Sequence, residues 1–551
     1  MKNTVLKIHP KDNVLVALQD LRKGQDIVFN GDSYVLKTDV EAKHKFTTQD
    51  LNPGDPVFMY GVLVGKAKEK IETGAKISTA NLKHASDEYS LSSVRKTGWH
   101  VPEENKWKGK TFMGYHRSDG SVGTANYWLI VPLVFCENRN VEVIKESLLE
   151  ELGYARPKKY TQLSRKMVEL YKAGATAESI LQTEFIKGKD ESSNPPLFKN
   201  VDGVKFLNHE GGCGGTREDS QALCALLAGY ITHPNVAGAT VLSLGCQNAQ
   251  ISLLQEEIAK KDPKFDKPIY YLEQQKIGLE VDMIAMALKQ TFAGLMIADQ
   301  NKRKPAPISK ICIGLECGGS DGFSGISANP AIGYTSDLLV AAGGSVILSE
   351  FPELCGVEQE MSDRCLNESI AKRFMHLMKT YNARAEAVGS GFYMNPSPGN
   401  IKDGLITDAI KSAGAAKKGG TSPVADVLDY TEKVTQPGLN LLCTPGGDVE
   451  STTAEVGSGA NIVLFTTGLG TPTGNPIAPV LKLSSNTALY KKMPDIIDIN
   501  TGGIIDGEET IEQAGERILD YVIKVASGEI KAKAVEHGQD DFIPWKRGVS
   551  L

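Results

Sequence analysis

Short apolar runs separated by turn signals fill residues 1–85. The runs are Val5–Ile8, Ile27–Phe29, Tyr34–Leu36, Val57–Tyr60 and Val62–Val64. Turns such as Asn30–Gly31–Asp32 and Pro53–Gly54 lie between them. Strand-length runs bounded by Gly, Asn, Asp and Pro are typical of small β domains. One helix is predicted over 14–22, because Leu15, Leu18 and Leu21 share a helical face.

From about residue 114 the pattern changes to apolar strand-length runs that alternate with helix-length periodic segments. The strand candidates are Tyr127–Phe135, Val204–Asn208, Thr240–Leu244, Ile269–Leu272, Lys310–Leu315, Ser345–Ser349, Asn440–Cys443, Ile462–Thr466, Val480–Ser484 and Ile496–Ile499. This alternation predicts parallel sheets with crossover helices.

Ten strands are too many for one modest sheet, so the chain is predicted to be a multidomain α/β protein. A polar linker is expected over 86–113, an α/β middle domain over 114–265 and a C-terminal domain over 267–551. The last is expected to be a Rossmann-like parallel sheet with flanking helices. The polar stretch 262–268 holds the boundary, and the strand at Ile269 then opens the C-terminal domain.

Composition and charge narrow the class of protein. Apolar residues make up 41% and charged residues 23% of the 551 residues, which excludes disordered and fibrous classes. The net charge, 61 − 67 = −6, does not suit a nucleic-acid partner. The N-terminus lacks a signal peptide pattern, and the longest apolar run, Trp128–Phe135, is too short to span a bilayer. We therefore expect a cytoplasmic protein with no membrane partner, whose nine cysteines are thiols.

Glycine-rich turns with unusual side chains follow several predicted strands. In open parallel sheets, ligands bind beyond the carboxyl ends of the strands. Three such turns carry a cysteine beside glycine: Cys213, Cys246 and Cys317. If these loops converge, three thiolates could hold iron, zinc or a cluster. The alternative is that each is a small buried residue in a tight loop.

Acidic residues and histidines add candidates at the same predicted edge. Carboxylate oxygens for a divalent ion are available from Glu316, Asp321, Glu350, Glu353 and Asp448. Each of them could instead be a helix cap or a solvated charge.

Two histidines are candidate bases. His44 has Lys43 and Lys45 beside it, and neighbouring cations lower an imidazole pKa and favour the neutral base. His209 adjoins the Cys213 loop. The alternative for His44 is an ordinary surface histidine.

Two enzyme classes have little support. Neither GxGxxG after the first strand nor GxxxxGK[ST] occurs, which disfavours a nucleotide-binding oxidoreductase. One GxSxG pattern places Ser320 after a predicted strand, but no clear helix follows and no suggestive histidine lies beyond it. Chance explains this pattern better than ester hydrolysis does.

Several long motifs resemble the altronate/galactarate dehydratase family. The strongest is Glu316–Pro330 (ECGGSDGFSGISANP), and it is joined by Gly114–Tyr127, Asn395–Asn400, Lys418–Ser422 and Phe465–Gly468. Residues 1–85 are similar to the family's β-clip, SAF-type domain. The stretch 77–81 departs from the family by lacking its usual histidine pair.

The resemblance implies metal-dependent loss of water from a sugar acid, with D-altronate going to 2-dehydro-3-deoxy-D-gluconate. It implies Fe²⁺ as cofactor, with Mn²⁺, another divalent ion or an iron–sulfur cluster as alternatives, and a homodimer formed through the middle domain. The residues that this reading assigns fall into three groups. The catalytic residues are His44, His209, Glu316 and Lys482; the substrate-binding residues are Arg117, Arg217, Asn329, Asn400, Thr466 and Thr467; the metal ligands are Cys213, Cys246, Cys317, Asp321 and Asp448.

Other readings stay open. Within the family, the alternatives are a galactarate dehydratase and a related sulfolactate-type lyase. Outside catalysis, the alternative is a protein that binds a sugar acid without turning it over. Ligand-induced stabilisation without product would indicate that last reading.

Overall fold

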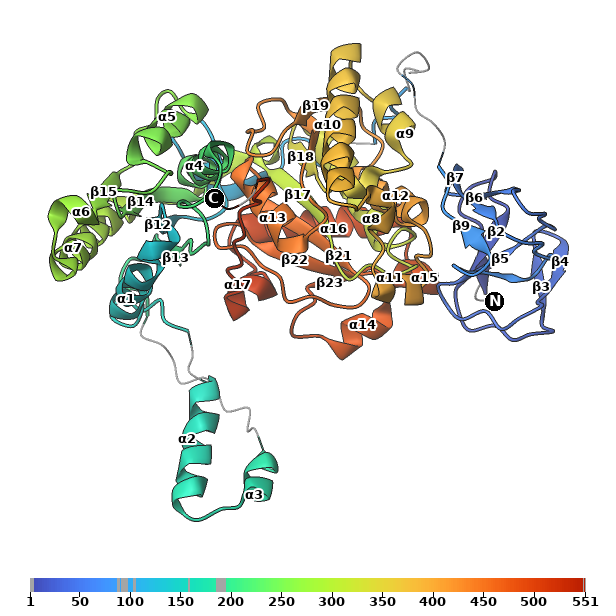
Figure 1. Cartoon of the computed structure of the whole chain (residues 1–551), viewed down its shortest axis with the longest axis horizontal. Helices are drawn as coiled ribbons and strands as arrows, with labels where there is room; N and C mark the ends of the chain where they lie inside the picture. Colours follow the sequence, from blue (N-terminus) through green and yellow to red (C-terminus); the bar gives the residue numbers. More distant parts are fainter. Residues whose placement is uncertain are drawn as a thin grey trace.

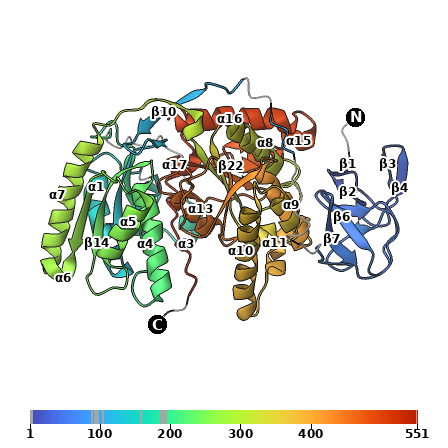
Figure 2. The same ribbon diagram turned by 90° about the horizontal axis from the view of Figure 1, so that it is seen from above.

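The computed structural model describes residues 4–86, 90, 98–102, 106–156, 159–184, 195–548 and 550. Three bodies lie in a row within these residues (Figures 1 and 2): the β domain at one end, a seven-stranded sheet in the centre and a four-stranded sheet at the other end. The predicted class, a multidomain α/β protein with an N-terminal β domain and a C-terminal parallel sheet, is confirmed.

The N-terminal domain is built from short antiparallel strands. They form a four-stranded sheet of order β1-β2-β5-β8, a three-stranded sheet β6-β7-β9 and the hairpin β3-β4. Their bounds are β1 Val5–Leu6, β2 Val14–Ala17, β3 Asp26–Phe29, β4 Asp32–Val35, β5 Lys45–Thr47, β6 Pro56–Met59, β7 Val62–Ala67, β8 Lys76–Ile77 and β9 Leu82–Lys83.

The helix predicted over 14–22 is wrong, because β2 occupies the start of that segment. Val14 and Val16 pack into one hydrophobic core, and Leu15 and Ala17 pack into another on the opposite face. A strand that is buried on both faces has no alternation of apolar and polar residues. The continuous run of apolar residues therefore also matched the spacing of the apolar face of a helix.

A four-stranded parallel sheet of order β13-β12-β14-β15 forms the middle domain. The strands are β12 Tyr127–Pro132, β13 Gly203–Phe206, β14 Val236–Ser243 and β15 Ile269–Glu273. The helices are α1 Asn138–Leu149, α2 Lys159–Lys172, α3 Ala177–Leu181, α4 Arg217–Thr232, α5 Ile251–Lys261, α6 Gln274–Ile277 and α7 Glu280–Ala298. Helices α2 and α3 project from this domain as a hairpin (Figure 1).

The expected boundary near residue 266 needs correction. Strand β15 pairs with β14, so it belongs to the middle sheet and does not open the C-terminal domain. The polar stretch before it is a surface connection inside the middle domain, and α7 follows on the same sheet. A three-stranded antiparallel sheet of order β11-β10-β16 lies at the entry to and the exit from the middle domain. Its strands are β10 Thr111–His116, β11 Val122–Gly123 and β16 Lys304–Pro307. Parts of the expected linker 86–113 lie outside the described residues, and its Trp107 is buried.

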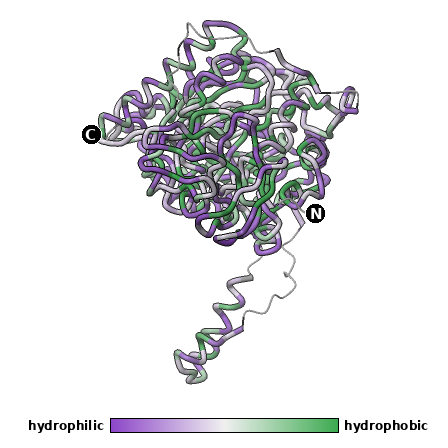
Figure 3. The backbone as a smooth tube through the Cα atoms, turned by 90° about the vertical axis from the view of Figure 1, so that its right-hand side faces the viewer, coloured by the Kyte–Doolittle hydropathy of each residue, from purple (hydrophilic) through white to green (hydrophobic). Residues whose placement is uncertain are grey.

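Helix α7 is long and apolar enough to cross a membrane by length and composition alone, contrary to the expectation that no such segment exists. One third of its most apolar window is buried, against β14, β15 and α1. Hydrophilic and hydrophobic positions alternate along the projecting hairpin (Figure 3). A core helix of a soluble protein passes the same test, so α7 alone is weak support for a membrane span.

The C-terminal domain is a parallel sheet of order β19-β20-β18-β17-β21-β22-β23. Its strands are β17 Cys312–Cys317, β18 Ser345–Leu348, β19 Val424–Leu428, β20 Gly438–Leu442, β21 Ile462–Thr467, β22 Val480–Ser484 and β23 Ile499–Asn500. Its helices are α8 Ala328–Ala341, α9 Glu358–Asp363, α10 Glu368–Ala387, α11 Pro398–Lys402, α12 Asp408–Ala415, α13 Asp448–Gly457, α14 Thr487–Lys492, α15 Gly503–Asp506, α16 Ile511–Ala526 and α17 Lys533–His537.

The order of these strands marks a binding edge. The chain runs from β17 to β18 and outward on one side, and then returns to place β21 on the other side of β17. Such a reversal of strand order opens a crevice beyond the carboxyl ends of the two strands. Cys317 ends β17 and Thr467 ends β21, so both lie at this crevice.

Candidate active site

The end of β17 is buried on all sides because β17 lies at the centre of the sheet. The strand carries Glu316 and Cys317 into the interior, where they are 0% and 3% exposed. Gly314 on the same strand leaves room for a third acidic side chain: a Cβ there would lie 2.4 Å from Oε2 of Glu455. The sequence therefore concentrates ionisable groups where a parallel sheet is normally purely apolar.

Two glutamates from the segment after β18 and two lysines complete the cluster. The Cys317 thiol donates to Oε2 of Glu353 at 2.9 Å. Lys418 Nζ lies 2.6 Å from Oε2 of Glu350 and 3.0 Å from Sγ of Cys317. Lys411, from α12, lies 2.7 Å from Oε1 of Glu353. We call Cys317, Glu350, Glu353, Lys411 and Lys418 the charged cluster.

Burial and ion pairing shift the pKa values of the acidic groups around this cluster in opposite directions. Burial raises the pKa of Glu316 well above its usual value, and a hydrogen bond to Glu350 favours its protonated form. The pKa of Glu353 is lowered: its burial is opposed by the nearby ammonium groups of Lys411 and Lys418. Burial also raises the pKa of the Cys317 thiol. Neighbouring carboxyl groups with opposite shifts are the usual arrangement of acid–base sites.

Asp321 is the centre of a second hydrogen-bond network, in the loop that follows Cys317. Its Oδ1 accepts hydrogen bonds from the hydroxyls of Ser324 and Ser485 at 3.0 and 2.8 Å. Its Oδ2 lies 3.0 Å from Nζ of Lys43, which comes from the N-terminal domain. Gly468 permits this close approach, because a Cβ there would lie 2.2 Å from Cγ of Asp321. The first domain thus supplies a cation to the edge of the C-terminal sheet.

A small pocket with a cavity volume of about 10 Å³, room for about one water molecule, lies between the two networks. Its polar lining comes from both domains and from separate loops. The lining residues include Tyr60, Cys317, Ser320, Asp321, Asn329 and Lys411. The ammonium, hydroxyl and amide groups of this lining have the chemistry that recognises an anionic, hydroxylated ligand, and a ligand larger than water enters only when the surrounding loops move apart.

Asp448 lies at the rim of the same edge, at the start of α13. A Cβ on Gly318 would lie 2.1 Å from its Oδ2, so this glycine lets the carboxyl approach the end of β17. Burial, with the negative charges of Glu350 and Glu353, raises the pKa of Asp448 to about 6. Unlike the cluster glutamates, Asp448 is only half-buried and can exchange protons with a ligand.

The charged cluster contains donors for a metal but already holds a cation. The donor atoms of Cys317, Glu350 and Glu353 lie within 4.8 Å of one another. The ammonium of Lys418 lies between 2.6 and 4.0 Å from all three side chains. Because this ammonium neutralises the donors from the position that an ion would occupy, the cluster fits a divalent ion poorly as arranged.

Comparison with known proteins covers almost the whole chain. Family models match residues 3–85 (altronate/galactarate dehydratase SAF domain), 114–299 (D-galactarate dehydratase/altronate hydrolase, second domain) and 308–550 (D-galactarate/altronate dehydratase, C-terminal). Altronate dehydratases of Bacillus subtilis and Escherichia coli are 34% and 32% identical to it, each over 99% of both chains. Galactarate dehydratase (L-threo-forming) of Escherichia coli is 31% identical over 97% of this chain and 94% of its own.

The chain belongs to the altronate/galactarate dehydratase family. It is therefore an enzyme of the hydro-lyase class, as the motifs predicted. The N-terminal β domain is the family's SAF domain. Within this family fold, the strongest predicted motif, residues 316–330, forms the turn from β17 to α8 at the crevice.

The structure brings most of the residues predicted from the family resemblance to this edge. Cys317, Asp321, Asp448 and Thr467 converge there, as the contacts above and the 3.2 Å approach of a Gly319 Cβ to Oγ1 of Thr467 show. Asn329 accepts from Thr466 at 2.7 Å, and Asn400 donates to the carbonyl of Ser320 at 2.8 Å. These amides brace the loops, and their role in binding substrate stays a prediction.

His44 lies in the turn of the SAF domain that contacts this edge, between Lys43 and Lys45. Lys45 donates to the carbonyl of Gly404 at 2.7 Å. The pKa of His44 is lowered, first by burial and then by Lys76 and Lys45, which agrees with the predicted neutral imidazole. Its role as a base stays a prediction.

The three-thiol metal site is wrong for the described part of the chain. Cys213 and Cys246 are exposed on loops of the middle domain, whereas Cys317 is buried in the C-terminal domain. The two exposed loops meet each other, since Asn248 donates to the carbonyl of Cys213 at 3.1 Å. The predicted domains already placed Cys213 and Cys246 in one domain and Cys317 in another, and the structure assigns their strands to two different sheets.

His209 lies in the middle domain with both ring nitrogens occupied. Nε2 lies 2.7 Å from the carbonyl of Pro132, and Nδ1 accepts from the backbone of Gly211 at 3.0 Å. Burial lowers its pKa to about 4. No ring nitrogen is left for a substrate, so His209 is a structural residue and the base role proposed for it is wrong.

The two predicted substrate-binding arginines and the predicted catalytic Lys482 lie elsewhere. Arg117, directly after β10, donates to the carbonyl of Pro234 and to Asn126. Arg217 is exposed at the start of α4. Lys482 is buried on β22, where it donates to Gln539 at 2.9 Å, and burial lowers its pKa to about 8. The positive charge at the edge comes instead from Lys43, Lys411 and Lys418.

Sequence reasoning missed those lysines as site residues. Lys418 lies in the recognised motif Lys418–Ser422 and Lys411 lies in none of the quoted motifs, and a lysine is usually a solvated surface charge. The available signal was for Lys418 alone, which is followed by Gly419–Gly420.

Proposed function

We propose that this protein dehydrates a sugar acid, converting D-altronate into 2-dehydro-3-deoxy-D-gluconate and water. The observation that carries the proposal is the charged cluster beside a small pocket at the carboxyl edge of β17 and β21. The similarity to altronate dehydratases over 99% of the chain supports the choice of altronate.

The elimination needs a cation for the substrate, a proton acceptor and a proton donor. Lys411 lines the pocket, and although burial lowers its pKa, the adjacent Glu353 carboxylate raises it, with a net increase, so Lys411 stays protonated. Its ammonium binds the substrate carboxylate and stabilises the negative charge that develops when the neighbouring C–H loses its proton. Lys43 and Lys418 add positive charge on either side.

Proton transfer is assigned to groups whose pKa values suit it. Asp448, with its pKa near 6, is ionised at neutral pH and accepts the proton next to the carboxylate. The departing 3-hydroxyl receives a proton from the neutral Cys317 thiol, which lines the pocket and has a protonated neighbour in Glu316. His44 is the second candidate for the acceptor.

The experiment that tests this function uses purified, reduced protein with D-altronate, galactarate and sulfolactate. The proposal expects a 2-dehydro-3-deoxy acid from altronate. Faster turnover of galactarate would assign the enzyme to its galactarate-specific relatives, whose Escherichia coli member is 31% identical. Stabilisation by altronate with no product from any acid would indicate a binding protein.

Fe²⁺ dependence stays part of the proposal, as the resemblance implied it. Because Lys418 neutralises the cluster donors, none of the steps above is routed through a metal. Metal analysis of anaerobically purified protein, with and without added Fe²⁺, Mn²⁺ or Zn²⁺, tests it.

We further propose a homodimer formed through the middle domain. Helix α7 supports this proposal, because its outer face exposes Val281, Met296 and Ile297, each more than half exposed. A contiguous apolar helix face on a protein surface usually marks an interface. Light scattering of the full chain tests the dimer, and Ile297→Glu should convert it to monomers.

A further inference from the structure

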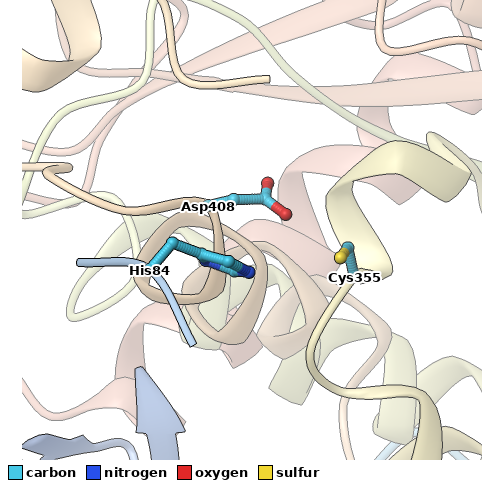
Figure 4. A group of neighbouring side chains, drawn as sticks. All are labelled: His84, Cys355 and Asp408. Carbon is cyan, nitrogen blue, oxygen red and sulfur yellow. The ribbon is translucent and has the colours of Figure 1, made fainter. Parts of the chain in front are cut away.

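A second group of metal-ligating side chains lies outside the active site described above. His84 follows β9 at the end of the SAF domain, Cys355 ends the short helix Phe351–Leu354, and Asp408 begins α12. The donor atoms of the three side chains lie within 4.8 Å of one another. Figure 4 shows the imidazole, thiol and carboxyl groups directed toward one another from three separate segments.

Two donor atoms of this group have no hydrogen-bond partner outside it. They are the buried atoms Nδ1 of His84 and Oδ2 of Asp408; the Asp408 carboxyl, which is 1% exposed, interacts with the Cys355 thiol inside the group. A buried polar atom without a partner costs roughly 1–3 kcal/mol of stability. Such atoms are rare in folded proteins, and a bound ion or water molecule is a usual explanation for them.

The group also lacks the neutralising cation that the charged cluster contains. Within the described residues, no lysine or arginine forms an ion pair with Asp408, whereas Lys418 and Lys411 pair with Glu350 and Glu353. Lys411, which lies on the same helix as Asp408, is paired with Glu353. In the part of the chain that the structure describes, the group therefore has no ion-paired cation of its own.

The backbone around the group is packed closely enough to hold three ligands in place. A Cβ on Gly356, next to Cys355, would lie 3.3 Å from both Ser86 and Ala409. The segment after β9 thus presses against the two elements that carry the other ligands. Tetrahedral metal bonds of about 2.0–2.3 Å place donor atoms roughly 3.5 Å apart, and the three donor atoms already lie within 4.8 Å of one another.

We propose that His84, Cys355 and Asp408 bind one divalent ion of the zinc class, which fastens the end of the SAF domain to the C-terminal domain. Imidazole, thiolate and carboxylate together suit a borderline ion such as Zn²⁺ or Fe²⁺ better than Mg²⁺ or Ca²⁺. The site shares no residue with the charged cluster, although it adjoins Glu353 and Lys411, and it does not depend on the proposed dehydration.

Cobalt substitution tests this site directly. Reduced, chelator-treated full-length protein is titrated with Co²⁺, and the thiolate-to-cobalt charge-transfer absorption is recorded. We expect one equivalent bound with this absorption, and displacement by Zn²⁺. Cys355→Ser should abolish the absorption, and His84→Asn should weaken Co²⁺ binding at least about 10-fold, the loss that even an outer partner of a metal ligand produces.

Matched variants separate this site from the other thiols. Cys365→Ser removes another buried cysteine of the same domain and should leave the absorption unchanged. Melting temperatures without metal confirm that each variant folds; because His84 is only half-buried, His84→Asn serves if Cys355→Ser does not fold. Absence of thiolate absorption in the wild type, its persistence in Cys355→Ser, or its loss in Cys317→Ser instead would overturn the proposal.

Discussion

Lys43 of the SAF domain lies 3.0 Å from the buried carboxyl of Asp321, which belongs to the C-terminal domain. The same ammonium lies 3.0 Å from Asp403. Lys43 adopts a left-handed backbone conformation, with φ of 74°, which turns its chain toward the C-terminal sheet. The first domain is thereby tied to the loop that lines the pocket.

Lys43→Met should weaken both stability and activity. Removing the ammonium leaves Asp321 buried without its cation, and breaking a buried pair in this way costs roughly 3 kcal/mol. Chemical denaturation measures the loss, and turnover measures the effect on the pocket. Lys37→Met, at an exposed lysine of the same domain, is the control and should change neither. Equal stability of the two variants would show that the contact does not hold the domains together.

The pairing of Lys418 with Glu350 should be visible in a double-mutant cycle. Lys418→Met leaves buried carboxylates without a cation and should destabilise the protein by about 3–5 kcal/mol. Adding Glu350→Gln removes one of these charges, so the double variant should recover at least about 1 kcal/mol. Denaturant unfolding gives the three values. Strict additivity would mean that the two side chains do not interact.

Activity should rise with pH through a transition near 6. The proposed base, Asp448, must be ionised, and its pKa is raised to about 6. Asp448→Asn should lower kcat strongly and remove this transition from its pH profile. The control Asp495→Asn changes an exposed carboxyl and should keep it. A transition that survives in Asp448→Asn but disappears in His44→Asn would assign the base to His44.

Stability gives an independent check on Asp448. Its folded pKa lies above the unfolded value of 3.8, so the folded state binds more protons between these values. The Asp448 contribution to stability therefore falls as pH rises from about 4 to 6. Relative to the wild type, Asp448→Asn should gain stability over that window, and a constant difference would contradict the raised pKa.

His209→Asn should affect folding and not chemistry. The imidazole satisfies two backbone groups inside the middle domain, and its loss should cost about 1–3 kcal/mol. Because both nitrogens are occupied, kcat should stay unchanged at temperatures where the variant is folded. A large loss of kcat with unchanged stability would instead restore His209 as a base.

Much of the fold could be predicted from the sequence, because most strands are apolar runs followed by recognisable turn residues. Nine of the ten strand candidates overlap strands well, since a run such as Ile462–Thr466 is apolar on both faces and is closely followed by glycine. The candidate Ile496–Ile499 meets β23 only at Ile499, and β19 was not predicted. The wrong predictions concerned features that depend on contacts between residues far apart in the sequence. Whether β15 pairs with β14 or with the C-terminal sheet is decided by contacts that leave no local pattern, and β2 looked helical because two cores bury it.

The site residues that lie on one loop could be predicted from the sequence, whereas those contributed by other elements or by another domain could not. Cys317 and Asp321 follow the same strand, so strand-end reasoning located both. The lysines that neutralise the cluster come from α12 and from the segment after it, and Lys43 comes from another domain. Their partners are up to several hundred residues away, and a charged residue's burial is set by tertiary packing alone. His84 and Cys355 were missed for the same reason.

The most direct test of the central claim is the rate at which D-altronate yields 2-dehydro-3-deoxy-D-gluconate in the wild type and in Lys411→Met. The wild type and Lys402→Met, which changes an exposed lysine of the neighbouring helix α11, should both form product. Lys411→Met should lose at least about 100-fold in kcat/KM while remaining folded, because it removes the cation that stabilises the transition state. Undiminished turnover by Lys411→Met would contradict the account.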